Sequence, residues 1–152
     1  MDYIEVLGCK IKKDRLYRIN EERMIFQWVK REGKSVYSVG FTPILAYLIY
    51  PVYAIKLKPV GTKVEYDGNL AVIEAGKRVL TFPSPLTGTV VEVNGTLERD
   101  PSPIVADPYG AWLVKIESTD VVNLRKLRKA QDVVEIFRKV IIREDIECLP
   151  RS

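Results

Sequence analysis

Short runs of β-branched and aromatic residues, separated by polar turns, dominate the middle of the chain. The first two runs, residues 25–29 and 36–39, flank the polar stretch Glu32-Gly33-Lys34 and are typical of a β-hairpin. The same pattern predicts further strands at residues 52–57, 70–74, 79–82, 87–94 and 111–117. Strands this short and this closely spaced predict a small β-sandwich or barrel-like domain.

Proline, glycine and asparagine mark the connections between these strands. Residues 42–48 fit one or two helical turns, with Thr42 as the N-cap and Pro43 at the first helical position. Asn94-Gly95 is predicted to close the preceding strand as a tight turn, because both residues tolerate positive φ. Residues 98–110 contain three prolines and are predicted to form a loop.

The apolar positions change to a helical period after residue 119. Ser118, Thr119 and Asp120 offer N-caps. The helical positions that follow are Leu124, Leu127, Val133, Phe137, Val140 and Ile141. We therefore expect an N-terminal extension (1–23), a β domain (24–119) and a C-terminal helical segment (120–152). The last segment either packs on the β domain or contacts a partner or a second copy.

Composition and charge narrow the functional classes. The 152 residues are 47% hydrophobic and 29% charged, as in ordinary globular proteins. The most apolar stretch, residues 41–55, contains two prolines and is shorter than the roughly 20 residues of a membrane-spanning helix. The N-terminus shows no short apolar run behind a basic segment, as a secretory signal would have. We therefore expect a cytoplasmic protein without a membrane partner.

The net charge of +4 comes from 24 basic and 20 acidic residues and is spread thinly. The densest basic patch, residues 125–129 (RKLRK), lies in a helical pattern. We interpret it as a solvated helix face, with a docking surface as the alternative. A nucleic-acid partner is not expected.

Histidine is absent, and there are two cysteines. The absence of histidine excludes His-containing metal sites and Ser-His or Cys-His nucleophile pairs within this chain. Cys9 and Cys148 lie near opposite ends without C-x-x-C spacing. We favour free thiols, and a disulfide remains possible.

The stretch Glu74-Ala75-Gly76-Lys77-Arg78 joins two predicted strands. Gly76 permits a left-handed backbone, so the turn can be tight and Lys77 can project outward. An exposed ion pair with Glu74 would contribute only about 0–1 kcal/mol. The position suits presentation of an amine to another protein. Taken alone, the same residues fit an ordinary solvated turn lysine equally well.

Short motifs surround this lysine in a fixed order. They are Trp28-Val29, Gly40-Phe41-Thr42, Pro59-Val60-Gly61, Glu74 with Lys77, Pro85-Leu86-Thr87-Gly88 followed by TVVEVN, Asp107-Pro108-Tyr109-Gly110 and Trp112-Leu113. In this order and spacing, over about residues 8–129, they resemble the glycine cleavage system H protein family. That family consists of lipoyl carriers related to lipoyl and biotinyl domains.

The resemblance implies a mostly β fold of the lipoyl/biotinyl type, called a barrel-sandwich hybrid. Two packed antiparallel sheets would carry short helices and a C-terminal helix. It also implies that lipoic acid is attached covalently to Lys77, that a lipoate ligase recognises Glu74, and that Gly76 shapes the hairpin tip. The chain would then be a carrier subunit of a multienzyme system and not itself an enzyme.

The partners implied are glycine decarboxylase, aminomethyltransferase and dihydrolipoyl dehydrogenase, between which the lipoyl-lysine arm shuttles an aminomethyl group. Several positions depart from the family pattern. Phe26-Gln27 stands where the family has a His, Tyr50-Pro51 replaces Gly-Asp, and Ala75-Gly76 and Arg78 replace Ser-Val and Ala beside the lysine. These changes concern surfaces that meet partners or the arm.

Two alternatives therefore stay open. One is an H-like lipoate-binding carrier for a sulfur-oxidising assembly with heterodisulfide-reductase-like subunits. The other is an interaction module that keeps the fold without being lipoylated. Biotin attachment is disfavoured, because biotinyl domains have Met on both sides of the lysine and the neighbours here are Gly76 and Arg78.

Overall fold

The computed structural model describes residues 1–148, and residues 149–152 of the predicted C-terminal segment lie outside the described residues. The strands are β1 (Tyr3–Val6), β2 (Cys9–Lys12), β3 (Leu16–Asn20), β4 (Ile25–Arg31), β5 (Val36–Phe41), β6 (Val52–Leu57), β7 (Lys63–Val64), β8 (Asn69–Ala75), β9 (Arg78–Pro83), β10 (Gly88–Val93), β11 (Val114–Glu117) and β12 (Arg128–Lys129). The helices are α1 (Pro43–Ile49), α2 (Thr96–Arg99), α3 (Pro103–Ala106), α4 (Val121–Arg125) and α5 (Val134–Arg143), with a 3-10 turn at Ala130–Asp132.

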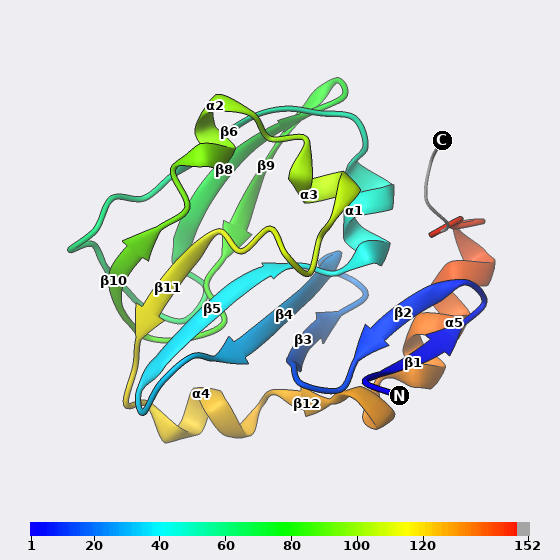
Figure 1. Cartoon of the computed structure of the whole chain (residues 1–152), viewed down its shortest axis with the longest axis horizontal. Coiled ribbons are helices and arrows are strands. Elements are labelled where there is room, and N and C mark those ends of the chain that lie inside the picture. Colours follow the sequence, from blue (N-terminus) through cyan, green and yellow to red (C-terminus); the bar gives the residue numbers. More distant parts are fainter. Residues whose placement is uncertain (149–152) are drawn as a thin grey trace.

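Two antiparallel sheets form the body of the molecule (Figure 1). The larger has the strand order β12-β3-β4-β5-β11-β10-β7, and the smaller has the order β6-β8-β9. A separate hairpin, β1–β2, lies beside α5 at one end. The mostly β fold with short helices and a C-terminal helix, expected from the sequence, is therefore confirmed.

The two large sheets share one hydrophobic core. Phe41 of β5 and Phe82 of β9 meet edge to face, with ring centroids 5.0 Å apart. Trp28 of β4 packs over Gly40, where a Cβ atom would come within 2.5 Å of the indole. Only glycine permits this close approach, which explains the small residue opposite a buried tryptophan.

Both predicted helix starts that can be checked at the capping atoms are confirmed. Thr42 Oγ1 accepts a hydrogen bond from the Leu45 amide at 3.5 Å, and Pro43 opens α1. The Asp120 carboxylate accepts hydrogen bonds from the amides of Val122 and Asn123 at the start of α4. Each cap satisfies amides that have no partner within the helix.

The prediction for residues 94–110 was partly wrong. Gly95 has φ −63° and leads into α2 rather than into a tight turn, and residues 103–106 form α3. Pro103 occupies the first position of α3, where a missing N–H costs no hydrogen bond. Proline here therefore starts a helical turn instead of excluding one.

The helical prediction for residues 125–129 was also wrong beyond Arg125, where α4 ends. Arg128 and Lys129 form β12, which pairs with Tyr17 and Leu16 of β3. Backbone hydrogen bonds to the otherwise open edge of β3 outweigh the local helical period of the side chains. The other side of β3 pairs with β4, so part of residues 1–23 belongs to the large sheet.

The N-terminal hairpin and the segment after α5 meet. Cys9 of β2 and Cys148 form a disulfide between residues 139 positions apart, so the expectation of free thiols was wrong. Phe137 of α5 packs edge to face on Tyr17, with centroids 6.0 Å apart. Local sequence could not show that these segments become neighbours.

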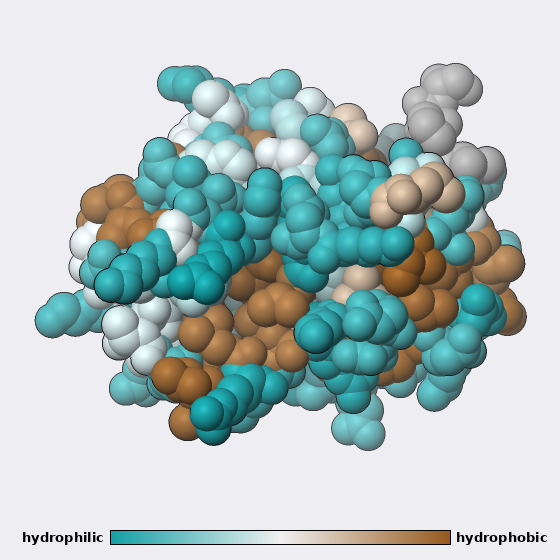
Figure 2. All heavy atoms as spheres, turned by 60° about the horizontal axis from the view of Figure 1, so that its bottom comes forward, coloured by the Kyte–Doolittle hydropathy of each residue, from teal (hydrophilic) through white to brown (hydrophobic). Residues whose placement is uncertain are grey.

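The surface is mixed in character. Figure 2, which brings the side with α4 and β12 forward, shows apolar patches interrupted by hydrophilic side chains. Val121 and Val122 of α4 are among the exposed apolar residues. Within residues 1–148, no helix has the length and hydropathy needed to cross a membrane.

Candidate functional site

The connection between β8 and β9 is a two-residue turn made of Gly76 and Lys77. Ala75 pairs with Arg78 at its base. Of the two turn residues only Gly76 has positive φ, at +58°. A hairpin loop of two residues with glycine first is the pattern of a type II′ turn, whose twist matches that of the flanking strands.

The hairpin tip is braced from the neighbouring strand. The Gly76 amide donates a hydrogen bond to the Pro51 carbonyl at 2.9 Å, and Val52 at the start of β6 pairs with Ala75. The tip therefore has a fixed backbone on one side, and the lysine extends from its outer end.

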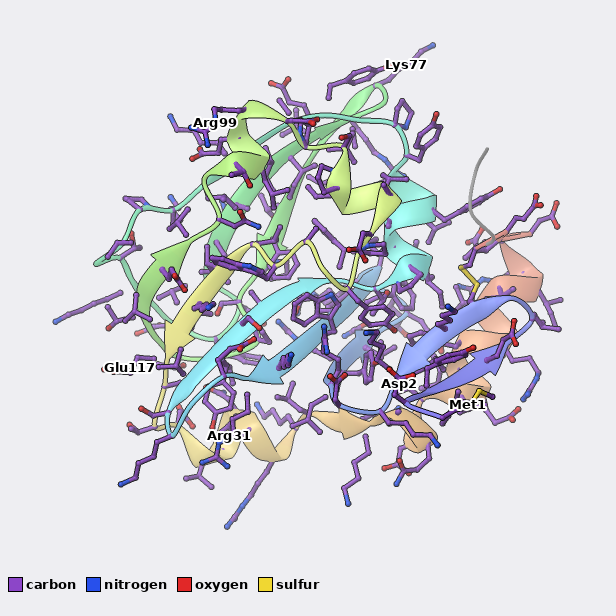
Figure 3. The ribbon with its side chains drawn as sticks, in the orientation of Figure 1. Met1, Asp2, Arg31, Lys77, Arg99 and Glu117 are labelled. Atoms are coloured by element: carbon purple, nitrogen blue, oxygen red, sulfur yellow. A yellow bond between two sulfur atoms is a disulfide. The ribbon has the colours of Figure 1, made fainter. Side chains whose placement is uncertain are left out.

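Lys77 is exposed and points away from the body of the molecule (Figure 3). Glu74 is exposed on β8 opposite Val79, and no ion pair joins Glu74 to Lys77 or Arg78 within residues 1–148. The three residues singled out from the sequence, Glu74, Gly76 and Lys77, thus lie together at one exposed tip. The Lys77 amine is open to another molecule.

A groove of about 280 Å³ runs beside β9, starting next to the hairpin tip at Arg78. Its walls come from β9, α1 and the beginning of β4. The lining residues are Arg23, Met24, Ile25, Gln27, Phe41, Leu45, Leu48, Ile49, Asp67, Arg78, Leu80, Thr81, Phe82 and Pro83. Apolar side chains predominate in number, but charged and polar groups also face the space, so the groove suits a ligand with both an apolar part and polar groups.

One polar group in the groove lacks a partner. Gln27 is 1% exposed, and its Nε2 donates a hydrogen bond to the Pro83 carbonyl at 2.7 Å. Its Oε1 is buried without a hydrogen-bond partner among the described residues. An unsatisfied buried acceptor costs about 1–3 kcal/mol.

Charged residues stand at the far end of the groove from the hairpin tip. Asp67 accepts hydrogen bonds from Arg18 and from Arg23, the second at 3.1 Å. Burial alone would raise the pKa of the Asp67 carboxyl, but the two guanidinium groups outweigh burial and hold that pKa below its ordinary value. The carboxylate is therefore ionised at neutral pH and already shared by two arginines.

Several residues of the short motifs that surround Lys77 in the sequence have structural roles. The Trp28 indole donates a hydrogen bond to the Pro108 carbonyl at 3.0 Å, and the Tyr109 hydroxyl donates to the Lys10 carbonyl at 2.8 Å. The Asn94 side chain donates to the Trp112 carbonyl at 2.8 Å. The first bond holds the loop after β10 on the large sheet, the second holds it on the β1–β2 hairpin, and the third joins its two ends.

The sequence did not predict the groove. The only local signal is that Leu80 and Phe82 alternate along β9 and so share one face. The opposite walls come from Gln27, Phe41 and Leu45, which are distant in sequence. Among residues 1–148, no three metal-ligating side chains gather into a group that could hold an ion.

Comparison with known proteins gives one consistent result. Residues 15–140 match the family described as glycine cleavage H-protein. The chain is 52% identical to glycine cleavage system H protein 1 of Aquifex aeolicus over 135 residues, covering 89% of this chain and 94% of that protein. It is 34% identical to H protein 5 of the same organism over 146 residues, covering 95% and 98%.

A solved structure agrees. The crystal structure of a glycine cleavage system H protein from Mycobacterium marinum superposes with a TM-score of 0.67 at 25% identity. The match covers 90% of this chain and 100% of that one.

Proposed function

The chain belongs to the glycine cleavage H-protein family, and from that premise we propose that Lys77 is the residue that carries its lipoyl group. The protein is a carrier and not a catalyst. The observation that supports Lys77 most strongly is its position: an exposed amine at the outer end of a two-residue turn, beside an apolar groove.

The turn explains why this lysine is accessible to a modifying enzyme. Its two flanking strands are fixed by pairing, and the Gly76 amide is tied to Pro51. An enzyme can therefore enclose the Lys77 side chain without deforming the fold. Glu74, exposed on the same hairpin, offers a negative charge by which a lipoate ligase would orient the tip.

Attachment joins the Lys77 Nζ to the carboxyl group of lipoic acid through an amide bond and removes the positive charge of the lysine. A bound lipoyl group would supply a dithiolane whose sulfurs can carry an aminomethyl unit, and the proposed partners are glycine decarboxylase, an aminomethyltransferase that takes the methylene unit, and dihydrolipoyl dehydrogenase. Residues of this chain supply the tether. A short flexible tether maintains an effective concentration of about millimolar at each partner site.

The groove fits the apolar part of such an arm. Arg78 and Leu80 line it directly after the lysine, and Phe82 continues it along the same strand. We therefore propose that the arm rests along β9 between visits to partner enzymes.

Exposed apolar side chains flank the hairpin and offer a contact surface for those enzymes. Tyr53 on β6 is 64% exposed, and Val79 on β9 is also 64% exposed. Exposed aromatic side chains such as that of Tyr53 are enriched in protein interfaces. Tyr53 and Val79 sit beside the lysine that each partner must reach.

Lipoylation in vitro tests the proposed attachment site. Wild type, Lys77→Arg and Lys56→Arg are incubated with a lipoate ligase, ATP and lipoic acid, and their intact masses are measured. Lys56 is an exposed lysine on β6 of the same small sheet and serves as the matched control. Wild type and Lys56→Arg should each gain one lipoyl group, whereas a gain by Lys77→Arg would contradict the assignment.

The partner set needs a separate assay. Lipoylated protein mixed with glycine decarboxylase should support exchange of labelled bicarbonate into glycine, and unmodified protein should not. If fully lipoylated protein supports no exchange, the glycine cleavage partners are wrong even though the carrier assignment stands.

A further inference from the structure

A cavity of about 250 Å³ lies beside β3 and β12, on the opposite side of the molecule from the hairpin tip. Three segments that are distant in sequence meet there: residues 18–23, 66–67 and 126–128. Its charged lining residues are Arg18, Arg23, Lys126, Arg128 and Asp67. Four positive charges thus face one negative charge around a single small space.

The one carboxylate is already engaged. Asp67 pairs with Arg18 and with Arg23, and the buried Arg18 also donates a hydrogen bond to the Ser84 carbonyl at 3.2 Å. Neither Lys126 nor Arg128 forms an ion pair in the described part of the chain. Two cations of the C-terminal segment therefore face the cavity with their charge uncompensated.

An aromatic ring holds two of these cations close together. The Arg18 guanidinium lies 4.2 Å and the Lys126 ammonium 4.5 Å from the centroid of the Tyr66 ring. Each contact is favourable by itself, but the two like charges that share the ring repel each other. An anion in the cavity would relieve that repulsion.

We propose that this cavity binds a small oxyanion of the phosphate class. Guanidinium groups match the geometry of such oxygens through paired N–H donors, and a lysine adds a point charge. The cavity is small and its lining is mainly cationic, so it suits a compact anion. This inference goes beyond the carrier function and does not depend on modification of Lys77.

The cavity and the groove are neighbours. Arg23 and Asp67 line both spaces. No residue of β9 lines the cavity, which lies beyond the end of that strand farthest from the hairpin tip. It therefore occupies a site separate from the attachment lysine.

NMR titration of the unmodified full-length chain tests the proposal. Inorganic phosphate and glycerol phosphate are each titrated at neutral pH, with ionic strength held constant by sodium chloride. The expected result is saturable shifts of the amides of residues 18–23, 66–67 and 126–128. The dissociation constant should be roughly tenfold higher in Lys126→Ala and in Arg128→Ala.

Lys129→Ala is the matched control, because Lys129 adjoins Arg128 in β12 but does not line the cavity. Saturable binding of either compound supports the site, and the tighter one identifies whether the free ion or a phosphate ester is its ligand. Equal weakening in Lys129→Ala, shifts reproduced by chloride alone, or binding of an acidic polypeptide but of neither phosphate compound would overturn the proposal.

Discussion

Gly76 shows how the backbone preference of one residue controls the site. Its φ of +58° lies in the left-handed region, where a side chain is strained whatever space surrounds it. The local sequence was sufficient to place Gly76 and Lys77 in a hairpin turn, because a two-residue hairpin loop is determined by its own amino acids. The groove beside them could not be predicted, because Gln27, Phe41 and Leu80 come together only through sheet packing.

Substitution of Gly76 by alanine should therefore lower the free energy of unfolding by about 1–2 kcal/mol. Denaturant titration measures the change. Gly33→Ala is the control, since Gly33 also lies in a turn with open space around it but without positive φ. Equal stability of the two variants would show that the turn does not require a left-handed residue.

The buried Tyr109 hydroxyl makes the free energy of unfolding depend on pH in the alkaline range. Burial raises the pKa of its hydroxyl to about 12, and burial likewise raises the pKa of the adjacent Tyr17. The unfolded chain releases these protons near pH 10, whereas the folded chain retains them. The stabilisation is therefore complete below pH 10 and is lost as the pH rises from there towards 12.

We expect the free energy of unfolding of wild type to fall over this pH range by about 2–3 kcal/mol more than that of Tyr109→Phe. Urea titrations between these pH values measure the difference. Tyr53→Phe, which alters an exposed tyrosine, should follow wild type. If Tyr109→Phe also followed wild type, the buried hydroxyl would not be the source of the pH dependence.

At the scale of elements, side-chain period predicted most strands and the last helix, and it failed where another force acted. Phe137, Val140 and Ile141 of α5 are buried as their spacing predicts. Arg128 and Lys129 are in β12 because the edge of β3 supplies backbone partners that no local pattern reveals. Pro103 starts α3 because its position there needs no amide donor.

The packing of α5 gives the prediction for this scale. Phe137 is fully buried against Tyr17, so Phe137→Ala should lower the free energy of unfolding by about 3–5 kcal/mol. Ile142 on the same helix is 66% exposed, and Ile142→Ala should change it by less than about 0.5 kcal/mol. Thermal or denaturant unfolding distinguishes the two. Similar losses in both variants would mean that α5 does not pack as described.

At the scale of the whole molecule, a disulfide links two segments that are far apart in the sequence. The Cys9–Cys148 disulfide joins the N-terminal hairpin to the segment after α5, enclosing almost the entire sequence. Cross-linking such a long loop restricts the unfolded chain more than the folded one. The sequence left the pairing open, because nothing local indicates that the two segments approach.

Cys148→Ser should lower the free energy of unfolding by about 2–5 kcal/mol, and a reducing agent should lower that of wild type by a similar amount. The reducing agent should leave Cys148→Ser unchanged, which provides the control. An unfolding midpoint of wild type that is indifferent to reduction would argue that the disulfide does not form in solution.

The proposed attachment site is one amine at the hairpin tip, and its modification state in the native host tests the proposal most directly. Intact mass and peptide mapping of the protein purified from that host should show one lipoyl group, located on the peptide that contains Lys77. An unmodified protein, or a lipoyl group on any other lysine, would contradict the assignment.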